Sequence, residues 1–78
     1  RFSVHVASFR SQDKVEEIAQ GLRDKGYEAW VEPAADQPGW FRVFMGHYRT
    51  WAEAEQQAAW MIENGVVERA HAFPDSGE

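Results

Sequence analysis

The sequence predicts a small α+β domain in the order β-α-β-β-α-β, with a four-stranded antiparallel sheet and both helices on one face. Three observations lead to this prediction: a repeat across the two halves of the chain, an alternating apolar pattern in the strands, and an apolar stripe with end caps in each helix. A sheet of this kind buries one face under its helices and leaves the other uncovered. Any binding surface is therefore expected on the uncovered face.

Residues 2–33 and 41–72 read as two copies of one unit. Val4 in the first copy corresponds to Val43 in the second, a separation of 39 positions (43 − 4 = 39) that holds along both copies. A constant offset without an insertion indicates a duplicated supersecondary unit. Each copy alone would leave an apolar face in water, so we expect the two to pack together as a single domain over residues 1–74.

The first copy predicts a strand, a helix and a second strand. Apolar and more polar residues alternate over residues 2–7, the period of a half-buried strand. Ser11 is a good N-cap, and Gly26 suits the left-handed position after a helix. Between them, one helical stripe holds Val15, Ile18, Ala19 and Leu22. The second strand covers Glu28–Glu32 and ends at a proline.

The second copy predicts the same three elements. Its first strand covers Trp40–Met45, and Thr50 with Glu53 forms a capping box that opens the helix. Gly65 follows the end of that helix, and the last strand covers about Glu68 to Phe73. The helical stripe consists of Ala54, Ala58, Met61 and Ile62.

Size and composition restrict the class of protein. Seventy-eight residues without cysteine form one domain near the lower limit for a core that has no disulfide or thiolate metal site. The chain has no signal peptide and no membrane-length apolar run, and it begins at Arg1, so we expect a piece of a longer protein. Residues 75–78 are expected to form a frayed tail.

The net charge of −5 bears on the partner. Phosphate backbones are bound mainly by Lys and Arg side chains. An acidic domain is therefore a poor general nucleic-acid binder, and a neutral or cationic ligand or a polar uncharged polymer suits the charge better.

Strand alternation also predicts which side chains face away from the helices. The helix side is expected to hold Val4, Val6, Ala29, Val31, Val43, Met45, Ala70 and Ala72. The uncovered side is then expected to hold Ser3, His5, Glu28, Trp30, Glu32, Arg42, Phe44, Arg69, His71 and Phe73. Several aromatics among hydrogen-bonding groups favour a binding face. The alternatives are that the loop or tail covers these aromatics, or that the alternation is offset by one residue.

Two segments carry a family resemblance. VHVASF followed by a helix, and WFRVFMGHY followed by a second helix, resemble the SPOR domain, the sporulation-related repeat of bacterial envelope proteins. The family's pattern is similar to VQVGSF in the first half and YRVRVGPF in the second. The resemblance extends from Phe2 to about Phe73 and implies the same β-α-β-β-α-β fold, of the ferredoxin-like or ribonucleoprotein-like kind.

The resemblance also implies a function. SPOR domains bind peptidoglycan glycan strands that lack stem peptides, and so gather at the division septum. The location implied is the periplasm, or the outside of the cytoplasmic membrane, at the cell wall. The family's strand glutamine falls on His5, its serine on Ser8, its Tyr-Arg-Val on Phe41, Arg42 and Val43, and its glycine on Gly46.

This sequence departs from the family pattern at three positions. His5 replaces glutamine, Ala7 replaces glycine and His47 replaces proline. Histidine still donates and accepts hydrogen bonds, so binding is expected to survive with an altered preference. The change at His47 is expected to affect only the turn.

The chemistry of a denuded glycan suits the uncovered face. Sugar C–H faces stack on aromatic rings, and the lactyl carboxylate on every second sugar favours Arg42 or Arg69 because guanidinium pairs well with carboxylate. Single hydrogen bonds contribute about 1 kcal/mol each, so micromolar affinity is expected. The predicted glycan-binding residues are His5, Ser8, Trp30, Arg42, Phe44, Arg69, His71 and Phe73.

Other functions were weighed against glycan binding. An RNA-recognition domain shares the element order and exposes aromatics, but the required motif spacing is absent and the charge is adverse. His5 and His71 become neighbours if the first and last strands pair, yet two histidines make a weak metal site. A protein-interaction module remains an alternative, although Trp51 and Trp60 are expected to pack against the stripe of the first helix.

No nucleophile or spaced carboxylate pair indicates catalysis, so we predict a non-enzymatic domain without cofactor or metal. The expected partner is denuded glycan and not nucleic acid. The domain itself is expected to be a monomer without membrane contact, although its parent protein is free to carry a membrane anchor.

Overall fold

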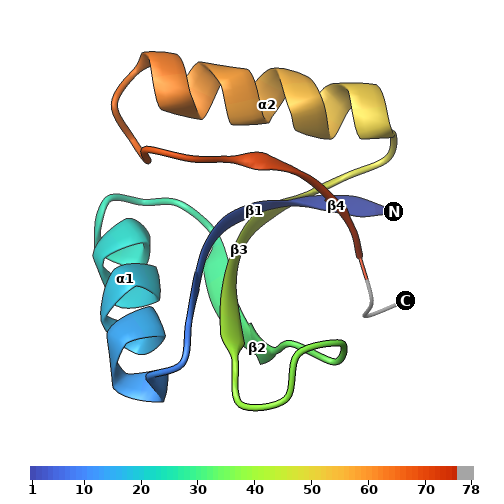
Figure 1. Ribbon diagram of the computed structural model, residues 1–78. Helices are drawn as coiled ribbons and strands as arrows, with labels where there is room; N and C mark the ends of the chain where they lie inside the picture. The colour runs from blue at the N-terminus through green and yellow to red at the C-terminus, as the bar shows by residue number, and fades with distance from the viewer. Residues whose placement is uncertain (76–78) are drawn as a thin grey trace.

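The computed structural model describes residues 1–75 and has the predicted element order (Figure 1). The elements are β1 (Phe2–Phe9), α1 (Gln12–Asp24), β2 (Ala29–Pro33), β3 (Phe41–Tyr48), α2 (Trp51–Glu63) and β4 (His71–Pro74). The strands form one antiparallel sheet in the order β2-β3-β1-β4. The predicted α+β fold is confirmed.

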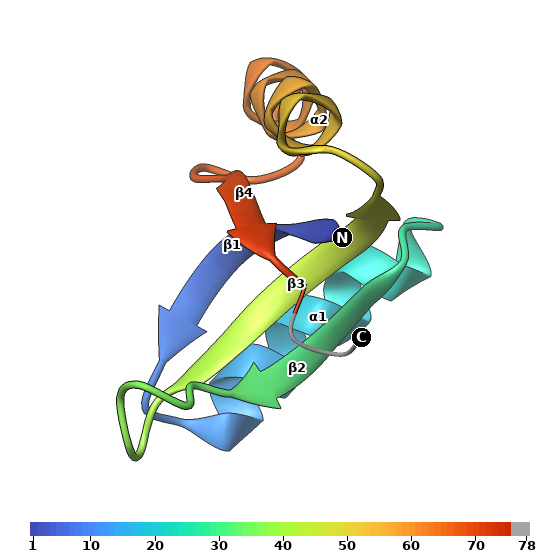
Figure 2. The ribbon, with the colours of Figure 1, turned by 90° about the vertical axis from the view of Figure 1, so that its right-hand side faces the viewer.

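The helices cover different parts of the sheet. Helix α1 lies mainly on β2 and β3, whereas α2 lies mainly on β4 and β1. Figure 2 shows the other face of the sheet toward the viewer, with α1 behind it and α2 at one end. The helices pack on the sheet and not on each other.

The expected packing of two tryptophans against α1 is wrong. Trp51 instead meets the edge of the Phe2 ring, with ring centroids 5.7 Å apart. Trp51 and Trp60 remain 49% and 46% exposed. Because α2 rests on the opposite end of the sheet, its flanks have no first helix to pack against.

The local signals for the helices are confirmed. Ser11 Oγ accepts a hydrogen bond from the amide of Lys14, and Thr50 Oγ1 accepts one from the amide of Glu53. The backbone of Gly26 is left-handed, with φ of 97°, as expected after a helix. One stripe residue is misassigned, since Ile62 is 43% exposed.

The core lies between the helices and one face of the sheet. It contains the predicted strand residues Val4, Val6, Ala29, Val43, Met45 and Ala72, with Val31 and Ala70 packed against it. From the helices it contains Val15, Ala19, Leu22, Ala54, Ala58 and Met61. The predicted alternation is therefore correct for the buried face.

A bulge in β1 changes the alternation after His5. His5 pairs with Phe44 and Ala7 pairs with Val43, so Val6 is an extra residue on β1. Beyond the bulge, Ser8 pairs with Arg42. Paired residues project to the same face, which places Ser8 on the uncovered side, where strict alternation from Val4 would have put it under the helices.

A second bulge lies in β3. Phe2 pairs with Tyr48 and Val4 with Met45, which leaves two β3 residues, Gly46 and His47, opposite one residue of β1. Gly46 has φ of 70°, the conformation of a glycine bulge. A Cβ at this position would lie 2.5 Å from the Tyr48 hydroxyl. Both backbone and space therefore require glycine here.

The last strand differs from its predicted bounds. β4 begins at His71, not near Glu68, and pairs with β1 only over Phe2–His5. Within the described chain, the outer edge of β1 has no strand partner beyond that pairing. Asp75, assigned to a frayed tail from the sequence, donates its amide to the carbonyl of Arg1 at 2.9 Å. The other tail residues, 76–78, lie outside the described residues.

Candidate functional site

The uncovered side of the sheet carries a continuous cluster of rings, here called the aromatic face. It comprises His5, Trp30, Arg42, Phe44, His47, His71 and Phe73. The rings of Phe44 and Phe73 are 5.4 Å apart, and those of Trp30 and Phe44 are stacked at 6.0 Å. His5 lies 5.7 Å from Phe44 and 5.6 Å from Phe73. The rings predicted for the uncovered side therefore lie together in the structure; they are His5, Trp30, Phe44 and Phe73.

Phe44 forms the centre of the aromatic face. It is only 5% exposed, because Trp30, His5 and Phe73 surround it. The surrounding rings thus provide much of the cover that the sequence analysis had attributed, as an alternative, to a loop or tail. Partly exposed Trp30 and Phe73 offer ring surface, while Phe44 supports them from below.

His5 and His71 form a pair across β1 and β4. Their register is direct, and Nδ1 of His5 lies 3.2 Å from Nε2 of His71. Burial, together with the nearby His71 and Arg42, lowers the pKa of His5 to about 4. His5 is therefore neutral at neutral pH, and its Nε2 is buried without a hydrogen-bond partner among the described residues.

Arg42 joins the polar and aromatic parts of the face. Its guanidinium carbon lies 5.0 Å from the centre of the Phe73 ring, a cation–π contact. It also donates to Asp36 of the β2–β3 loop at 2.8 Å. The Arg42 side chain is 14% exposed, so its charge is held in place before any ligand arrives.

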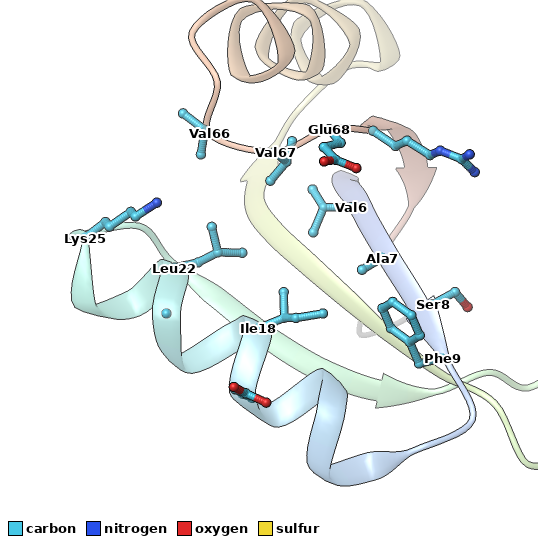
Figure 3. A pocket seen from close by; sticks show the side chains of 13 residues that line it. Val6, Ala7, Ser8, Phe9, Ile18, Leu22, Lys25, Val66, Val67 and Glu68 are labelled. Carbon is cyan, nitrogen blue, oxygen red and sulfur yellow. The ribbon is translucent and has the colours of Figure 1, made fainter.

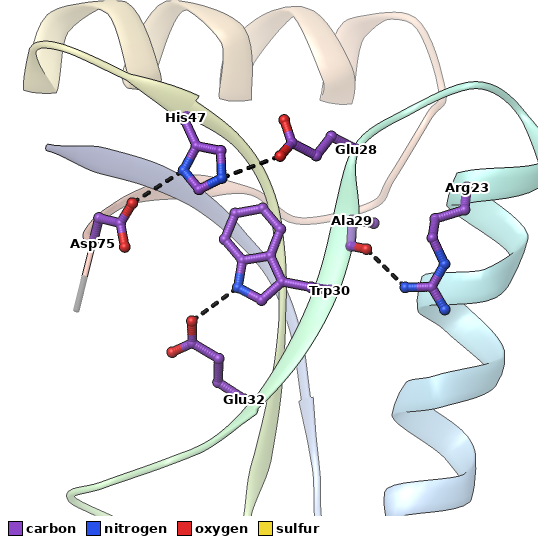
Figure 4. A network of polar contacts seen from close by, with 7 residues as sticks. All are labelled: Arg23, Glu28, Ala29, Trp30, Glu32, His47 and Asp75. Carbon is purple, nitrogen blue, oxygen red and sulfur yellow. Dashed lines mark hydrogen bonds and ion pairs between the residues drawn. The ribbon is translucent and has the colours of Figure 1, made fainter. Parts of the chain in front are cut away.

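His47 is a member of the aromatic face that the sequence analysis missed. Its ring stacks on Trp30 at 4.6 Å with planes 13° apart (Figure 4). Its nitrogens lie 3.1 Å from a Glu28 oxygen and 3.0 Å from an Asp75 oxygen. The signal that could have found it is Gly46, whose bulge turns His47 toward Trp30.

Trp30 is fixed at both ends. Besides the His47 stack, its indole nitrogen donates to Glu32 at 2.8 Å, along the same strand (Figure 4). Glu28 and Glu32, both predicted for the uncovered side, thus orient the two rings at this edge of the face. The result is an aromatic surface with a defined orientation.

Two predicted site residues lie away from the centre of the cluster. Ser8 is on the uncovered side through its pairing with Arg42, near the end of β1. Arg69 precedes β4 and is exposed, where it lines a groove beside α1. The late start of β4 is the reason, since a strand from Glu68 would have carried Arg69 onto the sheet.

The aromatic face has the chemistry of a binding surface for a polar ligand with apolar faces. It combines ring surface, the imidazole pair of His5 and His71, and one guanidinium. In residues 1–75, no three His, Asp or Glu side chains are grouped so that they could hold a metal ion. No helix in that range is long and apolar enough to cross a membrane.

Fold and face together define a small α+β domain whose sheet carries an aromatic surface on its uncovered side. The family model of the SPOR domain matches residues 1–64, which is most of the chain, and the chain therefore belongs to the SPOR family. SPOR domains are peptidoglycan-binding modules of bacterial envelope proteins. The matched segment ends before β4, so His71 and Phe73 lie outside it. Comparison with curated proteins found no match, nor did comparison with solved structures.

Proposed function

We propose that this domain is a non-catalytic module that binds peptidoglycan glycan strands without stem peptides and directs its parent protein to the division septum. The observation that carries the proposal is the continuous aromatic face, in which ring surface and hydrogen-bonding groups alternate. Trp30 and Phe73 suit the C–H faces of sugars. Arg42 suits the lactyl carboxylate exposed when the stem peptide is absent.

The absence of the stem peptide decides recognition in this proposal. An amidase that removes the peptide leaves a free carboxylate on the lactyl group. That carboxylate would replace Asp36 as the partner of the Arg42 guanidinium, which lies over the Phe73 ring. A peptide-bearing strand offers an amide in its place and adds bulk against the flat face. Arg42 is thereby the residue that distinguishes the two kinds of strand.

The test is a pull-down with cell-wall sacculi, either intact or pretreated with an amidase. We expect the domain to bind the treated sacculi and to bind intact ones weakly. Trp30→Ala and Arg42→Ala should each reduce binding to treated sacculi by about tenfold, as for the loss of a stacked ring or a charged hydrogen bond. Arg49→Ala removes the same charge from the exposed β3–α2 connection and serves as the control.

Circular dichroism must show that each variant is folded. Equal binding to intact and treated sacculi would contradict the denuded-strand preference. Unchanged binding by folded Trp30→Ala and Arg42→Ala proteins would contradict the site. A single-stranded RNA oligonucleotide tests the alternative, because RNA binding would weaken steeply with salt, whereas the proposed glycan binding changes much less.

Asp36 provides a more specific test of the role of Arg42. The Asp36 side chain is 69% exposed, and its carboxylate pairs with the same guanidinium that the glycan carboxylate would contact. Asp36→Asn removes this competing charge, so affinity for denuded glycan should rise several-fold, within the range for one exposed ion pair. A decrease would mean that Asp36 orients Arg42 more than it competes.

A further inference from the structure

A second site lies away from the aromatic face, beside α1. It is a groove of about 600 Å³, here called the β1 groove, lined by Val6–Phe9, the side of α1 that carries Ile18 and Leu22, and the segment Val66–Arg69. Figure 3 shows Ile18 and Leu22 of α1 facing Val6 and Phe9 of β1 across it. The groove exists because β4 begins late, which leaves the outer edge of β1 uncovered beyond His5.

The second copy of the repeat contains an equivalent site and shows how the protein partly closes it. The equivalent site beside β3 is lined by Gly26–Glu28, Met45–Tyr48 and Met61, and measures only about 300 Å³. Met45–Tyr48 correspond to Val6–Phe9 at the constant offset (45 − 6 = 39).

In the β3 copy, the protein's own main chain and an aromatic ring close the site. The amide of Gly46 donates to the carbonyl of Glu28 at 3.2 Å, which extends the ladder between β2 and β3. The Tyr48 ring lies over Gly46, within 2.8 Å of where a Cβ would be.

In the β1 copy, neither closure is made. No backbone hydrogen bond joins Ala7 to Val67, both of which the structure describes. Ala7 stands where the other copy has Gly46, and Phe9, at the position of Tyr48, is 38% exposed. The outer edge of β1 is thus left for another chain to pair with.

Helix α1 keeps this space clear. Gly21 lies in the middle of the helix, where glycine is less favourable than alanine by about 1 kcal/mol. A Cβ there would meet nothing within 4 Å, so the core does not require glycine. The second copy has Trp60 at this position (60 − 21 = 39). Gly21 therefore gives an approaching chain access to the bare edge of β1.

We propose that the β1 groove binds an extended segment of a partner protein, which adds to the edge of β1 as a strand and places an aromatic or branched side chain against Ile18 and Phe9. Beyond the bulge at Val6, the backbone groups of Ala7–Phe9 have the regular spacing of a strand, which matches a polypeptide and not a saccharide. The groove bears both signs of charge, from Glu17, Lys25, Glu68 and Arg69. These charges favour a segment with little net charge. The proposal is independent of glycan binding by the aromatic face.

The test uses a panel of capped eight-residue peptides of alternating Thr and Val, uncharged, with Phe placed at each position in turn. Titration followed by amide NMR should shift the signals of Ala7–Phe9 and Val66–Arg69. N-methylation of alternate peptide amides removes the donors that pair with β1 and should abolish binding. Gly21→Trp introduces the residue of the second copy and should weaken binding at least about tenfold, equivalent to 1.4 kcal/mol.

The matched control is Gln20→Trp, at an exposed position one residue away that does not line the groove. It should bind peptides like the parent. Both variants should retain binding to amidase-treated sacculi, so failure of this proposal is distinguishable from failure of the glycan proposal. Absence of binding by every peptide, equal binding of N-methylated peptides, or signal shifts confined to the aromatic face would each overturn the peptide site.

Discussion

The two halves of this domain contain the same elements in the same order, but their long strands, β1 and β3, end in different surroundings. β1 and β3 start and end at equivalent positions, as do α1 and α2 (41 − 2 = 39; 51 − 12 = 39). The third elements depart from the offset, because β2 begins at Ala29 whereas β4 begins at His71. In the second half, Gly46, His47 and Tyr48 close the end of the strand and complete the aromatic face. In the first half the same positions leave a groove.

This difference shows how a duplicated unit acquires two surfaces. The strands and helices carry the packing pattern, so they remain equivalent. The last three residues of each long strand, Ala7–Phe9 and Gly46–Tyr48, lie beyond its pairing with the outer strand, β4 or β2. Gly46 permits a left-handed bulge, whereas Ala7 does not reach that conformation readily. At this position of the repeat, the closed strand end has Gly46 and the open one has Ala7.

The largest effect is expected for Gly46→Ala. The left-handed backbone and the contact with Tyr48 should together lower the free energy of unfolding by about 2–4 kcal/mol, which chemical denaturation would measure. The matched change in the other half is Ala7→Gly, expected to destabilise by at most about 1 kcal/mol. Similar effects of the two substitutions would show that the two strand ends do not differ as described.

An intermediate effect is expected for the contribution of His5 to the pH dependence of stability. The equivalent of His5 in the other half is Phe44. The pKa of His5 is lowered from 6.5 to about 4 in the folded state, mainly by burial. The unfolded chain therefore binds more protons between these values, and stability should fall as pH decreases from about 6.5 to 4. We expect His5 to contribute about 1–2 kcal/mol to this loss, after discounting for its partial exposure.

The check is the pH dependence of unfolding in urea for the parent and His5→Gln proteins. The variant should lose less stability over this range, because glutamine does not titrate. Parallel curves for the two proteins would mean that His5 is not held neutral by its surroundings. Carboxylates titrate in both proteins and cancel in the comparison.

The smallest effect is expected for Gly21→Ala. The added Cβ meets nothing within 4 Å, so the helical preference of alanine should raise the free energy of unfolding by about 0.5–1 kcal/mol. Thermal unfolding measures the change, with Gln20→Ala as the neighbouring control. A loss of stability in the Gly21→Ala protein would indicate that the helix needs glycine for internal reasons, which would weaken the argument for an approaching chain.

The sequence allowed much of the architecture to be predicted because the relevant signals are local. The caps at Ser11 and Thr50 each act within one helical turn. The alternation in β1 and β3 correctly assigned the core and most of the aromatic face. The repeat fixed the element order, since each copy supported the assignments made in the other.

The errors concern features that depend on the other half of the molecule. The bulge at Val6 depends on its pairing with β3, and without it Ser8 would face the helices. His47 was expected to affect only the turn, because its stack on Trp30 requires the Gly46 bulge. Trp51 and Trp60 were assigned partners on α1, but the position of α2 over β4 and β1 decides their surroundings.

The burial of Phe44 has a consequence for the kinetics and thermodynamics of recognition. The domain has a small apolar cluster on the uncovered side of the sheet in addition to the main core, and its rings hold one another in place. The glycan binding that we propose would therefore require little additional ordering of side chains, which would reduce the entropic penalty of complex formation. Such a preorganised surface is expected to select its ligand by shape, with few rearrangements on contact.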